Sequence, residues 1–153
     1  MTGRLFPFLF IVITIAMMIS CSSGPDKLQV LPSPSEDVEL QFQLLDDGTP
    51  TYLVLYKGKL VIDTSALGFE FTDQEPMAKN FDIEEVRFFA LDEYWEMPWG
   101  EQLEVRNNYN GMLVYLEEDE KPYRKMTIEF KVYDDGLGFR YHFPGQKNMD
   151  TLR

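Results

Sequence analysis

Cysteine and histidine are almost absent from this chain of 153 residues, which contains one of each. With Cys21 as its single cysteine, the chain cannot form an internal disulfide. The single histidine, His142, has no second imidazole or thiolate with which to build a transition-metal site, and it leaves no Ser-His-Asp arrangement to pursue. We therefore expect a structural role for His142. It lies on a predicted strand, and Arg140 lies on the same face of that strand.

Basic residues are scarce as well. The chain has 14 lysines and arginines against 26 aspartates and glutamates, which gives a net charge of −12. Such a chain repels phosphate backbones, which argues against nucleic acid as a partner, and the same acidity is typical of a soluble secreted domain. A hydrophobic content of 44% and an aromatic content of 14% are sufficient for a packed core. The length allows at most one ordinary domain.

The first 20 residues are organised like an export signal. Arg4 supplies a short positive region, and the apolar run Leu5–Ile19 is shorter than the roughly 20 residues that cross a membrane. The run ends at Met18-Ile19-Ser20-Cys21, which resembles a bacterial lipobox with Met18 where leucine is more usual. We expect lipid on Cys21 to anchor the protein to a bacterial outer membrane, on its periplasmic or cell-surface side. An ordinary cleaved signal with an incidental cysteine is the alternative.

Residues 21–35 are rich in serine, proline and glycine, which predicts a tether with a first short strand at Leu28–Leu31. Residues 36–153 are predicted to form the domain, because apolar and polar residues alternate there with the period of a strand. One predicted face consists of Val38, Leu40, Phe42 and Leu44, and a later one of Met126, Ile128, Phe130 and Val132.

Turn signals separate these alternating segments. Turns are predicted at Asp46-Asp47-Gly48, at Lys57-Gly58 and at Asp134-Asp135-Gly136. Asn110-Gly111 is the strongest hairpin signal, because both residues tolerate the positive φ of a type I′ turn; it predicts strands at Leu103–Asn108 and Met112–Glu117. Outside the signal, no continuous segment of ten or more residues shows helical periodicity. The pattern therefore predicts an all-β fold, an antiparallel sandwich or barrel.

Several motifs resemble the N-terminal domain of family 97 glycoside hydrolases, which are bacterial α-glucosidases and α-galactosidases of starch-utilisation type. The resemblance runs from about Lys27 to Pro144. Its landmarks are L-G-F-E-F at Leu67–Phe71, P-W-G-E at Pro98–Glu101, R-N-N-Y-N at Arg106–Asn110 and D-D-G-L-G-F-R-Y at Asp134–Tyr141. It implies a large antiparallel β-sandwich, of which these residues supply the early strands.

The resemblance also implies that catalysis lies elsewhere. In the family this domain precedes a catalytic barrel, which carries the catalytic carboxyl groups and most of the calcium ligands. No catalytic or metal residue is therefore carried over to this chain, and calcium is implied for the intact enzyme alone. The expected partners are α-linked oligosaccharides or polysaccharides, reached through that enzyme, together with the missing barrel and the membrane.

Hydrolysis of a glycosidic bond needs two carboxyl groups, and the carboxylates with aromatic neighbours are Glu93, Glu96 and Glu101. The neighbours are Trp95 and Trp99, on which a sugar could stack. Trp95, Trp99 and Glu101 are thus the candidate carbohydrate contacts, although both tryptophans could equally serve the core or domain packing. The acidic run Glu117–Glu120 is expected to be a solvated hairpin tip. Two other functions stay open: a carbohydrate-binding surface lipoprotein without catalysis, and a structural remnant without a ligand.

Overall fold

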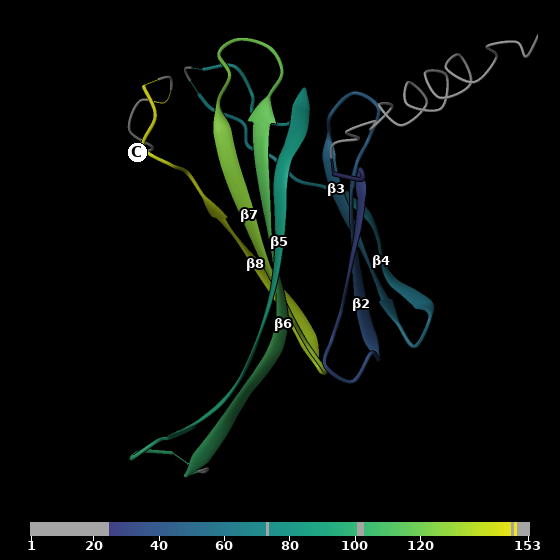
Figure 1. Cartoon of the computed structure of the whole chain (residues 1–153), viewed down its shortest axis with the longest axis vertical. Helices are drawn as coiled ribbons and strands as arrows, with labels where there is room; N and C mark the ends of the chain where they lie inside the picture. The colour runs from purple at the N-terminus through teal and green to yellow at the C-terminus, as the bar shows by residue number, and fades with distance from the viewer. Residues whose placement is uncertain (1–24, 73, 101–102, 148, 150–153) are drawn as a thin grey trace, which may run out of the picture.

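The computed structural model describes residues 25–72, 74–100, 103–147 and 149. Within them, the strands form two four-stranded antiparallel sheets in which each strand pairs with its neighbours in the sequence (Figure 1). The first sheet contains β1 (Leu28–Pro32), β2 (Val38–Leu44), β3 (Pro50–Tyr56) and β4 (Lys59–Ala66). The second contains β5 (Phe81–Glu96), β6 (Glu104–Glu118), β7 (Lys125–Tyr133) and β8 (Gly136–His142). This arrangement confirms the predicted antiparallel β-sandwich.

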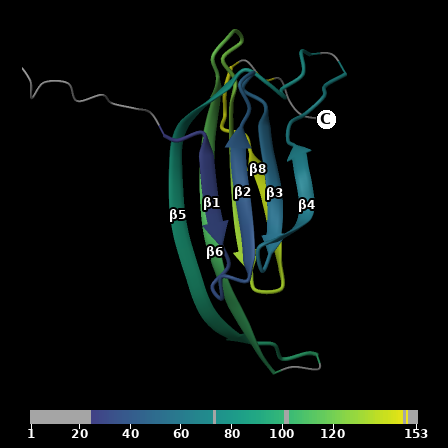
Figure 2. The same cartoon turned by 90° about the vertical axis from the view of Figure 1, so that its right-hand side faces the viewer.

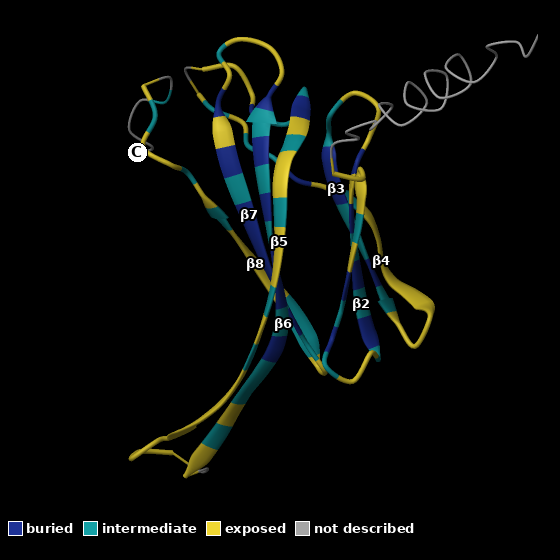
Figure 3. Cartoon of the chain, in the orientation of Figure 1, coloured by how far each residue is buried: buried dark blue, intermediate teal, exposed yellow. Residues whose placement is uncertain are grey.

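The core lies between the two sheets, which Figure 2 shows stacked one in front of the other. Strict alternation puts Leu40 and Phe42 of β2 and Ile128 and Phe130 of β7 fully inside. The rings of Phe42 and Phe130 meet across the two layers with their centres 5.8 Å apart. Figure 3 shows buried segments along β2, β6 and β7. Each buried side chain of this size contributes on the order of 2 kcal/mol through the hydrophobic effect.

Three predicted turns are present. The turn at 57–58 joins β3 to β4, and both its residues have positive φ, 50° for Lys57 and 73° for Gly58, as a type I′ turn requires. The turns at 46–48 and 134–136 join β2 to β3 and β7 to β8.

The hairpin predicted at Asn110-Gly111 is wrong, because both residues lie inside the continuous strand β6. Asn110 pairs with Ala90 on one side, and its side-chain Nδ2 donates to the carbonyl of Pro32 over 3.0 Å, which ties the two sheets together. Gly111 pairs with Phe89, whose ring covers it so closely that an added Cβ would lie 2.3 Å from the ring. The glycine is needed for this close approach, and no turn is involved.

The long hairpin of this sheet is instead formed by β5 and β6. These two strands extend well beyond the rest of their sheet. Pairing between β6 and β7 runs from Asn110 to Glu117 only, whereas β5 and β6 stay paired out to Glu96 and Glu104. Their distal halves form a two-stranded arm, visible at the bottom of Figures 1 and 2. The amide of Met97 donates to the carbonyl of Leu103 over 2.8 Å and closes its end.

The sandwich starts earlier than the sequence suggested. The strand expected near Leu28–Leu31 is confirmed as β1 and pairs with β2 along its whole length, from Leu28 opposite Gln43 to Pro32 opposite Glu39. The folded unit therefore begins at Leu28 instead of residue 36. The predicted export signal and Cys21 lie outside the described residues. Among the residues that are described, no helix is long and apolar enough to cross a membrane.

Candidate functional site

The predicted sugar contacts lie on the arm. Trp95 is in β5 and Trp99 is in the loop at the tip, where its side chain is 86% exposed. Alternation along β5 places Trp95 on the same face as Glu93, whose carboxylate accepts a hydrogen bond of 2.9 Å from Asn107 of β6. Trp99 follows the strand and does not share this face by alternation. Glu101 lies outside the described residues.

The opposite face of the arm is braced by an ion pair. Arg106 donates from Nε and Nη2 to the two carboxylate oxygens of Asp92, both over 2.8 Å, and its guanidinium lies 5.6 Å from the centre of the Tyr94 ring. The hydrogen bonds from Arg106 hold the pKa of Asp92 below its usual value. The two-stranded arm is therefore crosslinked by side chains on both faces.

A second group of polar residues gathers on the outer face of the β5–β8 sheet, away from the core. Its centre is Glu129 of β7, which accepts a hydrogen bond of 2.6 Å from Nε of Arg140 and lies 2.7 Å from Nε2 of His142. Burial raises the pKa of Glu129, but the hydrogen bonds from Arg140 and His142 outweigh burial and leave that pKa below its usual value. The expected shared face of Arg140 and His142 is thus present, and both side chains contact Glu129.

Glu129 was not identified from the sequence. Its outward direction follows from the alternation with buried Ile128 and Phe130, but its position opposite Arg140 depends on the register between β7 and β8. The turn at 134–136 fixes that register: a two-residue connection between Tyr133 and Gly136 places Glu129 beside Arg140. Counting outward from this turn could have revealed the pair.

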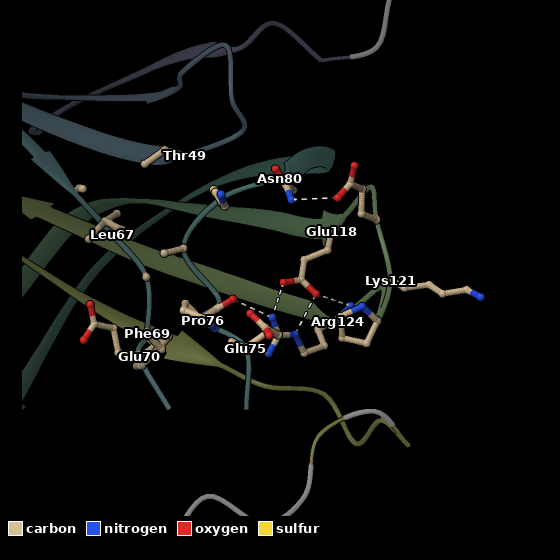
Figure 4. Close-up of a pocket in the computed structure, with 16 residues that line it drawn as sticks. Thr49, Leu67, Phe69, Glu70, Glu75, Pro76, Asn80, Glu118, Lys121 and Arg124 are labelled. Carbon is tan, nitrogen blue, oxygen red and sulfur yellow. Dashed lines mark hydrogen bonds and ion pairs between the residues drawn. The ribbon is translucent and has the colours of Figure 1, made fainter. Parts of the chain in front are cut away.

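A cavity of about 750 Å³ lies at one end of the sandwich, between the segment that leads from β4 to β5 and the β6–β7 hairpin (Figure 4). Its floor carries Arg124, which donates to both carboxylate oxygens of Glu118 over 2.6 and 2.8 Å. The same guanidinium donates to the backbone carbonyls of Glu75 and Pro76 over 2.8 and 2.9 Å. Arg124 thereby fastens the connecting segment to the hairpin.

This network corrects the expectation that Glu117–Glu120 is a solvated hairpin tip. The run does end β6 at a hairpin, but Glu118 is buried because it faces the cavity floor and pairs with Arg124. Every buried side-chain nitrogen or oxygen of the described residues has a hydrogen-bond partner. The two buried charged groups of the cavity, Glu118 and Arg124, therefore satisfy one another.

The acidic residues do not gather into a cation site within the part of the chain that the structure describes. No group of three or more histidine, cysteine, aspartate or glutamate side chains there is arranged to hold a metal ion. The calcium that the resemblance implies is expected for the intact enzyme, and that expectation stays a prediction.

Two stacked antiparallel sheets around one apolar core define an antiparallel β-sandwich module. The glycosyl-hydrolase 97 N-terminal family matches residues 31–152. The chain belongs to this family.

The relatives are enzymes much longer than the matched region. A retaining α-galactosidase of Bacteroides thetaiotaomicron is 22% identical over 133 residues, which are 87% of this chain and 19% of the relative. Two structures of a family 97 enzyme from Pseudoalteromonas sp. strain K8, one a variant in complex with panose and one in complex with acarbose, are 32% identical to this chain with a TM-score of 0.74. A β-arabinopyranosidase is 25% identical with a TM-score of 0.70. This chain covers 18% of the length of each solved structure, and 78% of this chain is matched.

Proposed function

We propose that this chain is the N-terminal, carbohydrate-associated sandwich of a secreted α-glycosidase that hydrolyses α-glucosidic or α-galactosidic bonds. The observation that carries the proposal is the family match over residues 31–152, supported by the agreement in fold with family 97 enzymes. Among the relatives, one is a retaining α-galactosidase, and another has structures in complex with panose, as a variant, and with acarbose. An α-linked oligosaccharide is accordingly the proposed substrate class of the whole enzyme.

Chemistry is assigned to the larger part of the polypeptide that the relatives possess. Cleavage of a glycosidic bond requires a general acid and a second carboxylate on opposite sides of the bond, at a defined separation. In the resembling family both belong to the barrel, together with most of the calcium ligands. The sandwich alone is therefore inactive, and its role is to support the barrel and the binding of glycan beside it.

The proposed location is the bacterial outer membrane, with a lipid on Cys21 as the anchor. The support is the apolar run that ends at Met18-Ile19-Ser20-Cys21, followed by polar residues that can space the sandwich from the membrane. One acyl chain gives marginal membrane binding, so several chains on the cysteine are needed for a stable anchor.

Enzyme assays of residues 22–153 test this division of labour. We expect the purified protein to release no sugar from aryl α-glucosides or aryl α-galactosides, with or without calcium. The matched variant is Glu101→Gln, which removes the one carboxyl group of the P-W-G-E segment. Turnover above background in the parent protein that disappears in Glu101→Gln would place catalysis in this segment and contradict the proposal.

A further inference from the structure

A hollow of about 260 Å³ lies on the outer face of the β5–β8 sheet. Its floor is the bare backbone at Gly138 of β8, where an added Cβ would meet nothing within 4 Å. The walls come from both β7 and β8: they are formed by Glu129, Lys131, Tyr133, Phe139 and Arg140. The hollow is large enough for one small-molecule group. The two tryptophans of the arm do not line it.

The polar groups around the hollow form a mixed set of donors and acceptors. Glu129 is an ionised carboxylate, held by Arg140 and His142 and lying 3.8 Å from the ammonium of Lys131. Arg140 uses only its Nε in this contact; its side chain is 66% exposed, and its two terminal nitrogens make no hydrogen bond to any residue that the structure describes. The guanidinium end of Arg140 is therefore free to donate to a ligand as a fork.

Aromatic rings hold the surroundings of the hollow in place. The ring of Tyr133 packs against that of Tyr109 at 5.2 Å, and its hydroxyl donates to the side-chain oxygen of Asn107 over 3.3 Å. Lys131 lies over Tyr109, 4.4 Å from the ring centre. These contacts orient the Lys131 ammonium and the Tyr133 ring before any ligand arrives, which lowers the entropic cost of binding.

The shape of the sheet favours an extended ligand on this side. In Figure 1 the arm bends away from the first sheet, so that the outer face of the second sheet is concave. Alternation along β5 puts Trp95 on this same face, at the far end of the arm. A polar hollow is thus continued by a curved surface that carries an aromatic residue.

We propose that this hollow binds a sugar unit of an α-linked oligosaccharide. The proposal rests on the proposed function, because it takes its ligand class from there. Sugar hydroxyls both donate and accept, so one unit can use the Arg140 fork and the Glu129 carboxylate together, and its C–H face can lie on the Tyr133 ring.

Titration of the whole chain with panose, followed by amide NMR, tests the proposal. We expect saturable shifts at the backbone of β7 and β8. Gly138→Leu fills the floor of the hollow, and Gly145→Leu is its control, since Gly145 is also unobstructed, lies beyond the end of β8 and does not line the hollow. Panose binding should be lost in Gly138→Leu and kept in Gly145→Leu.

Arg140→Gln should weaken panose binding about tenfold or more, because a hydrogen bond to a charged group is worth roughly 1.5–3 kcal/mol. Arg106→Gln is the matched control: it removes another exposed, ion-paired arginine, which lies on the opposite face of the arm, and should leave binding unchanged. Amide spectra of each variant without panose report whether it is folded. The Gly138→Leu and Arg140→Gln variants test the site independently of one another.

Two results would overturn the proposal. One is the absence of saturable shifts with panose in the parent chain, which would make this face a protein contact. The other is undiminished binding in Gly138→Leu, which would place the sugar elsewhere, such as at the arm. Either result would leave the proposed accessory role intact, because that role is tested by the hydrolysis assay and not by binding.

Discussion

Replacing Arg124 by leucine should destabilise the fold more than any exposed charge substitution. The side chains of Arg124 and Glu118 are 2% and 6% exposed, and the guanidinium also satisfies the carbonyls of Glu75 and Pro76. Without Arg124, the Glu118 carboxylate would stay buried and unpaired, and the segment that leads from β4 to β5 would lose its attachment to the β6–β7 hairpin.

The expected loss is about 3–5 kcal/mol, the usual cost of removing one partner from a buried ion pair. Typical domains have a total unfolding free energy of roughly 5–15 kcal/mol, so this loss would remove a large share of the stability. The matched control is Arg87→Leu. Arg87 makes a similarly short pair with Glu85, but the two side chains are 60% and 48% exposed, so removing it should lower the unfolding free energy far less.

Equilibrium urea unfolding of the parent chain and both variants, followed by tryptophan fluorescence and circular dichroism, measures the difference. The double variant Glu118→Leu/Arg124→Leu should recover part of the loss, because it removes the unpaired buried charge. The reasoning would be refuted if Arg124→Leu lowered the unfolding free energy no more than Arg87→Leu does.

Three further predictions concern the backbone, the anchor and the open edges. Gly111→Ala should lower the free energy of unfolding by about 1–3 kcal/mol, because its Cβ would lie 2.3–2.7 Å from the Phe89 ring. Gly138→Ala should leave the free energy of unfolding nearly unchanged, and equal urea midpoints for the two variants would contradict this reasoning. If Cys21 is lipidated, the parent chain should partition into detergent and carry acyl mass, and Cys21→Ala should not; equal partitioning of both would remove the anchor. Residues 22–153 should self-associate, because β4 and β8 are edge strands of the two described sheets and Val61 is 60% exposed. A monomer on size-exclusion chromatography with a sharp thermal transition would contradict this.

The alternation of apolar residues was sufficient to predict the parts of the fold where one strand face is buried and the other is polar. β2 and β7 have this arrangement, and the turns beside them contain glycine at positions of positive φ or after paired aspartates. Their faces and the antiparallel sandwich followed directly from that pattern.

The long strand β5 gave no such signal. A register shift between Ile83 and Glu85 breaks its alternation, and its distal half is exposed on both faces because only β6 accompanies it there. The same cause explains the error at Asn110-Gly111. A turn dipeptide and a glycine that accommodates an aromatic ring are identical in sequence, and only the pairing of Gly111 with Phe89 distinguishes them.

The polar sites were predictable only in part. Arg140 and His142 share a face because they are two residues apart on one strand. Glu129 and Arg140, like Glu118 and Arg124, come together through strand pairing, and 26 acidic residues offer too many candidate partners for a choice without the register. Charge composition could therefore not show that two of these carboxylates are buried.

Sequencing the gene beyond the codon for Arg153 tests the proposed function most directly, because the proposal makes this chain the N-terminal part of a longer family 97 glycosidase. The proposal predicts a reading frame that continues, directly or after a frameshift, into sequence for the family's catalytic barrel. A stop codon at this point, with no relative of the barrel encoded nearby, would contradict the account and favour a free-standing carbohydrate-binding lipoprotein.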